Sequence, residues 1–134
     1  MEYSNHELEV RKRRSEQARR MILRLLPTED EDDDALMLLY EGFYLQISFS
    51  DLHPLLVMHF VREIQRKITS KDKEIANRLN QQSVLGGHSL NTELGFYSYR
   101  TAHWLDAELT EDRFLEILNR SLAEAQHGFV NIAA

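Results

Sequence analysis

Residues 43–50 alternate strictly between apolar side chains and more polar ones. The apolar positions are Phe43, Leu45, Ile47 and Phe49, and the positions between them are Tyr44, Gln46, Ser48 and Ser50. Period two is the side-chain period of a β-strand, in which successive side chains point to opposite faces. The stretch therefore predicts a strand with one buried face, which a helix from elsewhere in the chain must cover.

Two more apolar segments extend this strand into an antiparallel meander. Residues 35–40 come before it, separated by Glu41 and Gly42, and this spacing predicts a two-residue hairpin turn in which glycine supplies the positive φ. Residues 55–64 come after it. Periodicity alone leaves a helix over residues 54–67 open, but β-branched and aromatic residues favour a strand here, namely Val57, Phe60 and Val61.

Two further strands, over residues 87–91 and 96–105, are predicted to pair across the turn at residues 92–95. The sheet then has five strands. Two groups of strands separated by helices cannot form the repeated crossovers of a parallel sheet. We therefore predict an α+β fold, in the order α-βββ-α-ββ-α, with a five-stranded antiparallel sheet and the helices mainly on one face.

The first two helices are predicted from their end signals. Residues 5–26 form a basic helix, which begins with a capping box of Ser4 and Glu7 and ends at Pro27. Residues 70–82 form a second helix, with Thr69 or Ser70 as its cap and a glycine pair as its stop.

The last helix has the strongest apolar stripe and is expected to be the main cover of the sheet. Thr110 caps it, and Glu111 and Asp112 occupy the first turn, where the helix dipole favours acids. Gly128 is its predicted stop. The stripe recurs at helical spacing, at Phe114, Leu115, Ile117, Leu118 and Leu122.

Length and composition narrow the class of protein. The chain has 134 residues, which suits one domain over residues 1–134, and it is 43% hydrophobic and 28% charged, as globular proteins are. No apolar run approaches the ~20 residues that cross a bilayer, and no signal-peptide core follows the charged start, so we expect a cytoplasmic protein without a membrane partner. Zero cysteines exclude disulfides and thiolate sites.

Charge is unevenly spread along a chain whose net charge is −6. The first helix is rich in arginine, and residues 29–34 are all acidic, which predicts a loop because like charges repel. Asp30, Asp32, Asp34 and Glu41 match the spacing of a calcium-binding loop, but Ala35 stands where such a loop needs glycine. We therefore predict no metal site there.

Residues that could carry chemistry are scattered. His53, His59, His88 and His103 include no pair at the i, i+4 spacing of a zinc-binding helix, although His88 and His103 could meet on adjacent strands. The glycine pair Gly86–Gly87 lacks the lysine and the following helix of a phosphate-binding loop. The sequence predicts no catalytic residue, no cofactor and no enzyme.

The second half of the chain resembles the YbjN-like family. The resemblance covers residues 36–122 and is carried by residues 76–122. These contain a helix ending in Leu79 and Asn80, a strand starting at glycine, and a final helix starting at Thr110 and Glu111, with Phe114 and Leu118 as its apolar positions. The family is similar in fold to type III secretion chaperones, which are small acidic dimers. The resemblance implies a non-enzymatic module of chaperone or regulatory type that binds a client protein or peptide.

Partner-binding residues are predicted in two places. Aromatic side chains on both faces of the last strand leave at least one of Tyr97, Tyr99 and Trp104 facing outward, which predicts a homodimer through this strand or the last helix. The alternative is a regulator that contacts nucleic acid or another acidic partner through its first helix, at Arg11, Arg13 and Arg14. The acidic net charge makes nucleic acid the less favoured partner.

Overall fold

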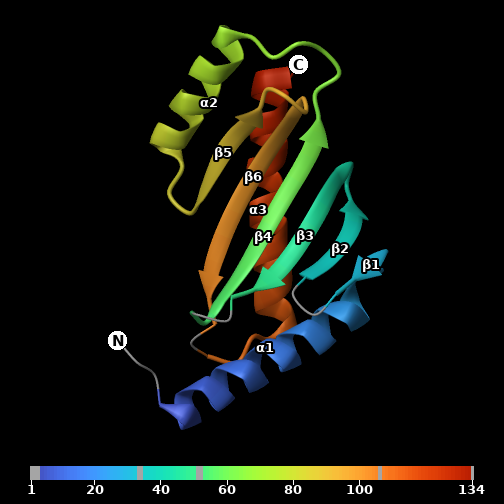
Figure 1. Ribbon diagram of the computed structural model, residues 1–134, viewed down its shortest axis with the longest axis vertical. Coiled ribbons are helices and arrows are strands. Elements are labelled where there is room, and N and C mark those ends of the chain that lie inside the picture. The colour runs from blue at the N-terminus through green and yellow to red at the C-terminus, as the bar shows by residue number, and fades with distance from the viewer. Residues whose placement is uncertain (1–3, 33–34, 51–52, 106, 134) are drawn as a thin grey trace.

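The structure, a computed structural model, describes residues 4–32, 35–50, 53–105 and 107–133. It confirms an α+β fold with three helices and one antiparallel sheet (Figure 1). The helices are α1 (Asn5–Leu25), α2 (Ser70–Gln82) and α3 (Glu111–Ala133). The strands are β1 (Asp30–Glu31), β2 (Ala35–Tyr40), β3 (Phe43–Phe49), β4 (Leu55–Glu63), β5 (Gly86–Asn91) and β6 (Phe96–Trp104).

The sheet has six strands, in the order β1-β2-β3-β4-β6-β5, so the prediction of five was wrong. The additional strand, β1, lies in the acidic run, where it pairs Asp30 with Met37 and Glu31 with Leu36. Arg19 of α1 offsets the repulsion between the acids, because its guanidinium lies 3.4 Å from Glu31 Oε2 and also donates to the carbonyl of Asp32. A cation from another element thus stabilises a strand that the local sequence disfavours.

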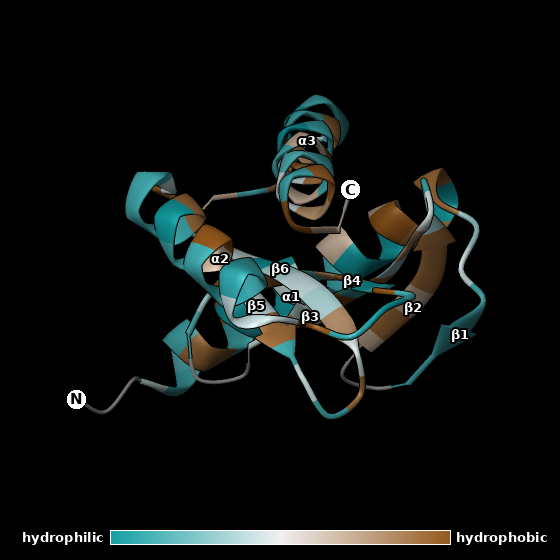
Figure 2. Cartoon of the chain, turned by 90° about the horizontal axis from the view of Figure 1, so that it is seen from above, coloured by the Kyte–Doolittle hydropathy of each residue, from teal (hydrophilic) through white to brown (hydrophobic). Residues whose placement is uncertain are grey.

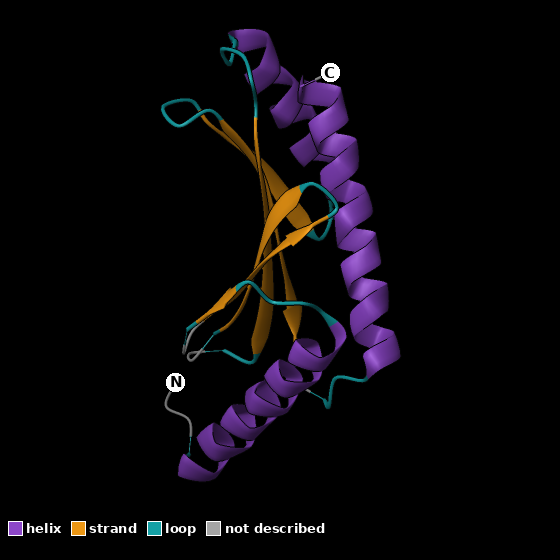
Figure 3. Ribbon diagram, turned by 90° about the vertical axis from the view of Figure 1, so that its right-hand side faces the viewer, coloured by secondary structure: helices purple, strands orange, loops and turns teal. Residues whose placement is uncertain are grey.

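The helix α3 runs along one face of the sheet, which we call the covered face (Figure 3). The strand register aligns the covered face in rows, one of which contains Leu38, Leu45, Phe60 and Tyr99. Phe114 and Leu118 of α3 are fully buried against these rows. Seen from above, α3 lies over the sheet and α2 lies beside β5 (Figure 2).

The tight turn between β2 and β3 follows the prediction. Glu41 has φ of 50° and Gly42 has φ of 86°. Both central residues are thus left-handed, as a type I′ turn requires, and this turn suits the twist of the two paired strands. The turn sets the register in which Tyr40 faces Phe43 and Leu36 faces Ile47.

Gly128 does not end α3, contrary to the prediction. It lies within the helix, which continues to Ala133, and it is buried against the sheet residues Tyr97 and His88. A Cβ at this position would overlap the hydroxyl of Tyr97 and lie 2.5 Å from Nδ1 of His88. Glycine is present here because its missing side chain makes room for two sheet residues, not because the chain turns.

An ion pair at its start and a hydrogen bond at its end connect α3 to other parts of the chain. At its start, Glu111 lies 3.8 Å from Arg24 of α1. At its end, the guanidinium of Arg66 donates to both carboxylate oxygens of Asp72, in the first turn of α2, and to the carbonyl of Ile132. The hydrogen bonds from Arg66 hold the pKa of Asp72 well below its usual value, so the pair stays ionised.

Candidate functional site

The sheet face opposite α3 carries no helix along its length, and we call it the open face (Figure 3). Small residues such as Ala35, Ser48 and Ala102 lie side by side across it, because the strand register brings them into one row with Val57. Short side chains project little from the backbone, which allows another chain to approach the sheet closely. The open face can therefore take part in a contact with another chain.

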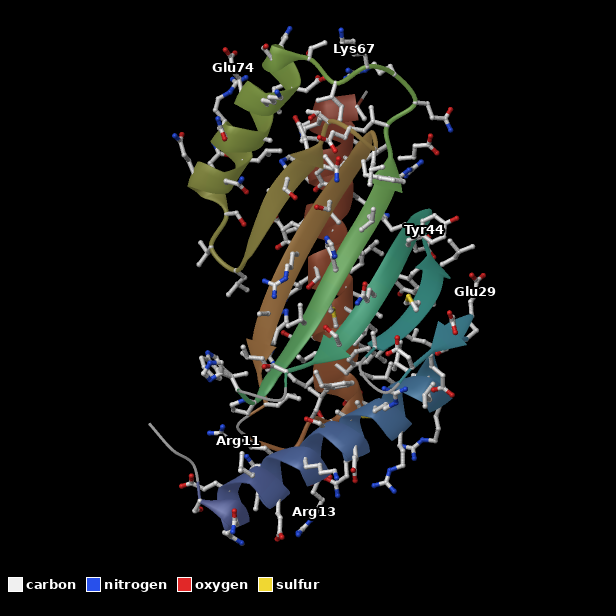
Figure 4. All side chains as sticks on the ribbon, viewed as in Figure 1. Arg11, Arg13, Glu29, Tyr44, Lys67 and Glu74 are labelled. Carbon is white, nitrogen blue, oxygen red and sulfur yellow. The ribbon has the colours of Figure 1, made fainter. Side chains whose placement is uncertain are left out.

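A hollow of about 260 Å³ lies at one side of the open face, near the outer strands. We call it the edge groove, and its walls are formed by Glu29, Asp30, Met37, Tyr44, Gln46 and Val61. Tyr44 is 63% exposed, and Figure 4 shows its ring projecting from β3 near that edge of the sheet. Exposed aromatic rings of this kind offer apolar area together with a polar hydroxyl, a combination enriched in protein interfaces.

The two edges of the sheet differ in their free backbone groups. On the β2 side, β1 pairs only with Leu36 and Met37, so that residues 38–40 have no strand on their outer side among the described residues. On the β5 side, the side chain of Asn80 occupies the backbone N–H and carbonyl of His88, and the hydroxyl of Ser83 donates to the carbonyl of Gly86. The β2 edge is thus open at the place where the edge groove lies, whereas the β5 edge is closed at these groups.

Of the three aromatic residues predicted to bind a partner, only Trp104 is exposed. Tyr97 and Tyr99 are 0% and 2% exposed and belong to the core under α3, so their side chains are not available at the surface of this chain. Trp104 is 65% exposed and faces Leu55 across β4 and β6 on the open face, at the end of the sheet far from the β5–β6 turn.

The arginines predicted to bind an acidic partner are divided between two sides of α1. Arg11 and Arg13 lie on opposite sides (Figure 4), whereas Arg14, three residues after Arg11, shares a face with Arg11. Further along the helix, Arg19 and Arg24 each pair with an acid of this chain, Glu31 and Glu111. The basic helix is thus partly neutralised from within, and contact with an acidic partner stays a prediction.

Three histidines, His59, His88 and His103, lie in surroundings that favour the neutral ring. Burial lowers the pKa values of His59, His88 and His103, and for His59 and His103 a nearby arginine adds to the effect. Nδ1 of His88 lies 2.7 Å from the hydroxyl of Tyr97, and Nε2 of His103 lies 3.1 Å from the hydroxyl of Thr101. The rings of His88 and His103 are thus each engaged in a local hydrogen bond.

Within the described ranges, no cluster of three or more His, Asp or Glu side chains is placed to hold a metal ion. Asp34, one of the four residues with calcium-loop spacing, lies outside these ranges. In the same part of the chain, none of the helices has the length and apolar character needed to cross a bilayer.

The edge groove does not show in the sequence, because the residues that form it are far apart in the chain. Met37, Tyr44 and Val61 come from three strands, and only the register places Tyr44 opposite Val61 and next to the diagonal neighbour Met37. One signal was available: in the alternation of β3, Tyr44 is a large aromatic residue at a position that must point away from the core.

The chain was compared with known proteins by sequence and by structure. It matches no family model and no curated protein sequence. Solved structures do match. YbjN from E. coli, described as a candidate transcription regulator, has a TM-score of 0.64 at 15% identity, over 87% of each chain.

Two other similar structures are chaperones bound to other proteins. SchA, in the HopA1–SchA chaperone–effector complex, has a TM-score of 0.59 at 14% identity and covers 98% of both chains. The Yersinia pestis type III secretion chaperone SycH, in complex with a stable fragment of YscM2, has a TM-score of 0.58 at 12% identity, over 85% of this chain and 98% of SycH. The chain therefore shares the fold of YbjN and of type III secretion chaperones.

Proposed function

We propose that this chain is a non-enzymatic protein-binding module that holds an extended segment of another protein at the edge groove. The single observation that carries the proposal is the exposed ring of Tyr44 above an apolar hollow, on a sheet face that no helix covers. The neighbouring free edge at residues 38–40 supports an extended partner, because unpaired backbone groups of an edge strand accept a further strand.

The charges around the edge groove indicate which segment would bind best. Glu29 and Asp30 form its rim, whereas Met37 and Val61 form apolar walls. A segment with one large apolar side chain next to basic residues matches both features, because opposite charges at an interface rim speed up association and select the partner. The chaperones with this fold, SchA and SycH, were solved with an effector and with a YscM2 fragment, which supports a protein client here.

Selection from a library of random peptides tests this proposal. We expect enriched peptides to combine apolar and basic residues and to bind with Kd values in the micromolar range. Replacing Tyr44 by Ser should weaken the binding of these peptides by about tenfold or more, and a tenfold change corresponds to ~1.4 kcal/mol. Leu94→Ser is the matched control, because Leu94 is equally exposed but lies in the β5–β6 turn. Peptides that bind the parent and Tyr44→Ser equally well would contradict the proposal.

Self-association is a second part of the proposal. Trp104 is exposed at the end of the open face, beside the half-buried Leu55. A second copy placed against this end would bury the indole without obstructing the edge groove. Sedimentation at micromolar concentration should give a dimer for the parent chain and a monomer for Trp104→Glu. A parent chain that sediments as a monomer would remove this part and leave peptide binding untouched.

A further inference from the structure

A second hollow lies on the other side of the sheet from the edge groove, between the α2–β5 turn and α3. We call it the α3 pocket, and its volume is about 230 Å³. Tyr99 and Thr101 of β6 form its floor, and Ile117 of α3 forms one wall. A Cβ at Gly86 would overlap the hydroxyl of Tyr99. Because glycine has no Cβ, the turn can pass close to the floor.

The apolar part of the α3 pocket continues out to the surface. Leu85 and Val84 form its lip and are 67% and 93% exposed, which is unusual for aliphatic residues in a tight turn. The cavity itself is smaller than the ~300–1,000 Å³ of pockets for drug-sized ligands. It therefore has room for a single side chain. The lip offers further apolar contact to the rest of the bound molecule.

The charged part of the α3 pocket is a pair of arginines on either side of Ile117. Arg113 and Arg120 lie four residues before and three residues after it, so all three share one face of α3. Both guanidinium groups reach the same carboxylate oxygen of Glu116, at 3.5 and 2.8 Å. Two cations thus share one anion, and all three side chains are exposed enough for these pairs to exchange readily with an incoming group.

Among the remaining polar groups of the α3 pocket, Glu124 lies close to one of the two arginines. It comes four residues after Arg120, about 6 Å along the helix, but eleven residues after Arg113, about 16 Å at 1.5 Å per residue. His103 is hydrogen-bonded to Thr101, and burial together with the nearby charge of Arg113 lowers its pKa, so it is neutral near pH 7. Within the pocket lining, Arg113 is therefore the arginine farther from Glu124, and a bound anion has to replace Glu116 at both arginines.

We propose that the α3 pocket binds the C-terminal residue of a peptide when that residue has a large apolar side chain. The side chain lies against Ile117 and Tyr99, and the terminal carboxylate lies between Arg113 and Arg120. A C-terminal residue fits this arrangement because its side chain and its carboxylate are attached to the same Cα. The two groups are therefore close enough together to reach Ile117 and its flanking arginines at the same time. The preceding peptide residues pass over Val84 and Leu85. The inference is independent of the edge groove, which lies on the opposite face.

The test uses synthetic tetrapeptides and NMR of the isotope-labelled chain. N-acetyl-Gly-Gly-Gly-Phe with a free carboxylate should produce saturable shifts at the Ile117 methyl groups and the Thr101 amide. The same peptide ending in a carboxamide should bind about tenfold more weakly, because it loses the charge-assisted hydrogen bonds. A peptide ending in Ala with a free carboxylate should also bind more weakly, because it leaves the apolar wall unfilled.

Variants separate the role of the arginines from general effects. Arg120→Gln should weaken binding of the carboxylate peptide about tenfold and leave the carboxamide peptide unchanged, so that a double-mutant cycle assigns the coupling to this pair. Arg78→Gln, an exposed arginine of α2, is the matched control and should change neither. Tyr44→Ser should also change neither, which keeps the result distinct from that at the edge groove.

Three results would overturn the assignment. The first is the absence of saturable shifts at Ile117 and Thr101. The second is equal affinity for the carboxylate and carboxamide peptides. The third is an Arg120→Gln variant that weakens both peptides to the same extent, because that result would indicate altered pocket shape instead of carboxylate recognition.

Discussion

The carboxamide of Asn80 forms two hydrogen bonds with the backbone of His88. Its Nδ2 donates to the carbonyl of His88 at 2.8 Å, and the N–H of His88 donates to Oδ1 at 2.7 Å. Paired donor and acceptor bonds of this kind are what a neighbouring strand would form with β5. A side chain of α2 thus takes the place of a seventh strand and blocks the edge of β5 at its centre.

Replacing Asn80 by Ala is expected to free this edge. The loss of two partly buried hydrogen bonds should lower the free energy of unfolding by about 1–2 kcal/mol, because the backbone groups of His88 lose their partner. Urea unfolding measures the loss, and light scattering should show association that rises with concentration. Asn77→Ala, an exposed asparagine of the same helix, is the control. A variant as stable as the control would mean that the Asn80 bonds contribute nothing net.

Replacing Gly128 by Ala should destabilise the chain even though alanine favours helices. The new methyl group would overlap Tyr97 and His88, and the forced shift should cost about 1–3 kcal/mol, more than the gain of ~1 kcal/mol in helix propensity. Asn119→Ala on the exposed side of α3 should be neutral or stabilising. Thermal unfolding of both variants checks the prediction, and a higher melting temperature for Gly128→Ala would contradict it.

Replacing Ile47 by Asp should unfold the domain. Ile47 has 0% exposure in the centre of the covered face, and a carboxylate there would be buried without a partner, at a cost of more than about 4 kcal/mol. Gln46→Asp places the same charge one position away, on the open face, and should leave the melting temperature within a few degrees of the parent. Circular dichroism distinguishes the two. A folded Ile47→Asp variant would refute the predicted packing of β3.

Acidification should destabilise the chain, and part of the effect should come from His88. Burial lowers its pKa, with Glu124 opposing the shift and His127 adding to it, so below pH 6.5 the unfolded state binds the proton more readily. Stability is therefore expected to fall as the pH drops through 6.5. Of the groups packed around the ring, Tyr97 and Tyr99 stay neutral in this range, because burial raises their pKa values.

The histidine contribution can be separated by substitution. His88→Gln should reduce the slope of unfolding free energy against pH between 7.5 and 5.5, whereas His53→Gln, at an exposed site, should leave the slope as in the parent. Urea unfolding at several pH values measures both. An unchanged slope in His88→Gln would show that other groups cause the acid sensitivity.

Local patterns predicted most of the secondary structure. The capping box at Ser4 and Glu7, the type I′ turn at Glu41 and Gly42, and the alternation in β3 each involve residues within a few positions of one another. Such features depend on backbone geometry that the neighbouring residues determine. The prediction of a fold similar to that of YbjN and the secretion chaperones also depended on local signals, in residues 76–122, and the structure confirms it.

The features that local patterns missed depend on contacts between distant residues. β1 forms in an acidic run because Arg19 reaches it from α1, and Gly128 lies within a helix because Tyr97 and His88 lie beneath it. The α3 pocket likewise combines residues of β6 with residues of α3 that only the packing of the helix brings together. The orientation of the side chains of β6 could have been predicted from the sequence. Tyr97, Tyr99 and Thr101 alternate with Phe96, Ser98 and Arg100, which places both tyrosines on one face.

Because α3 follows all six strands in the sequence, the ribosome synthesises the sheet before the helix that covers it. Synthesis runs from the N-terminus, so the whole covered face, up to Tyr97 and Tyr99, emerges before Phe114, Leu118 and Ile132 can be laid over it. Each nascent copy therefore displays the apolar side of its sheet until α3 arrives. A protein that we propose to bind segments of other proteins thus exposes its own core residues to solvent during its synthesis.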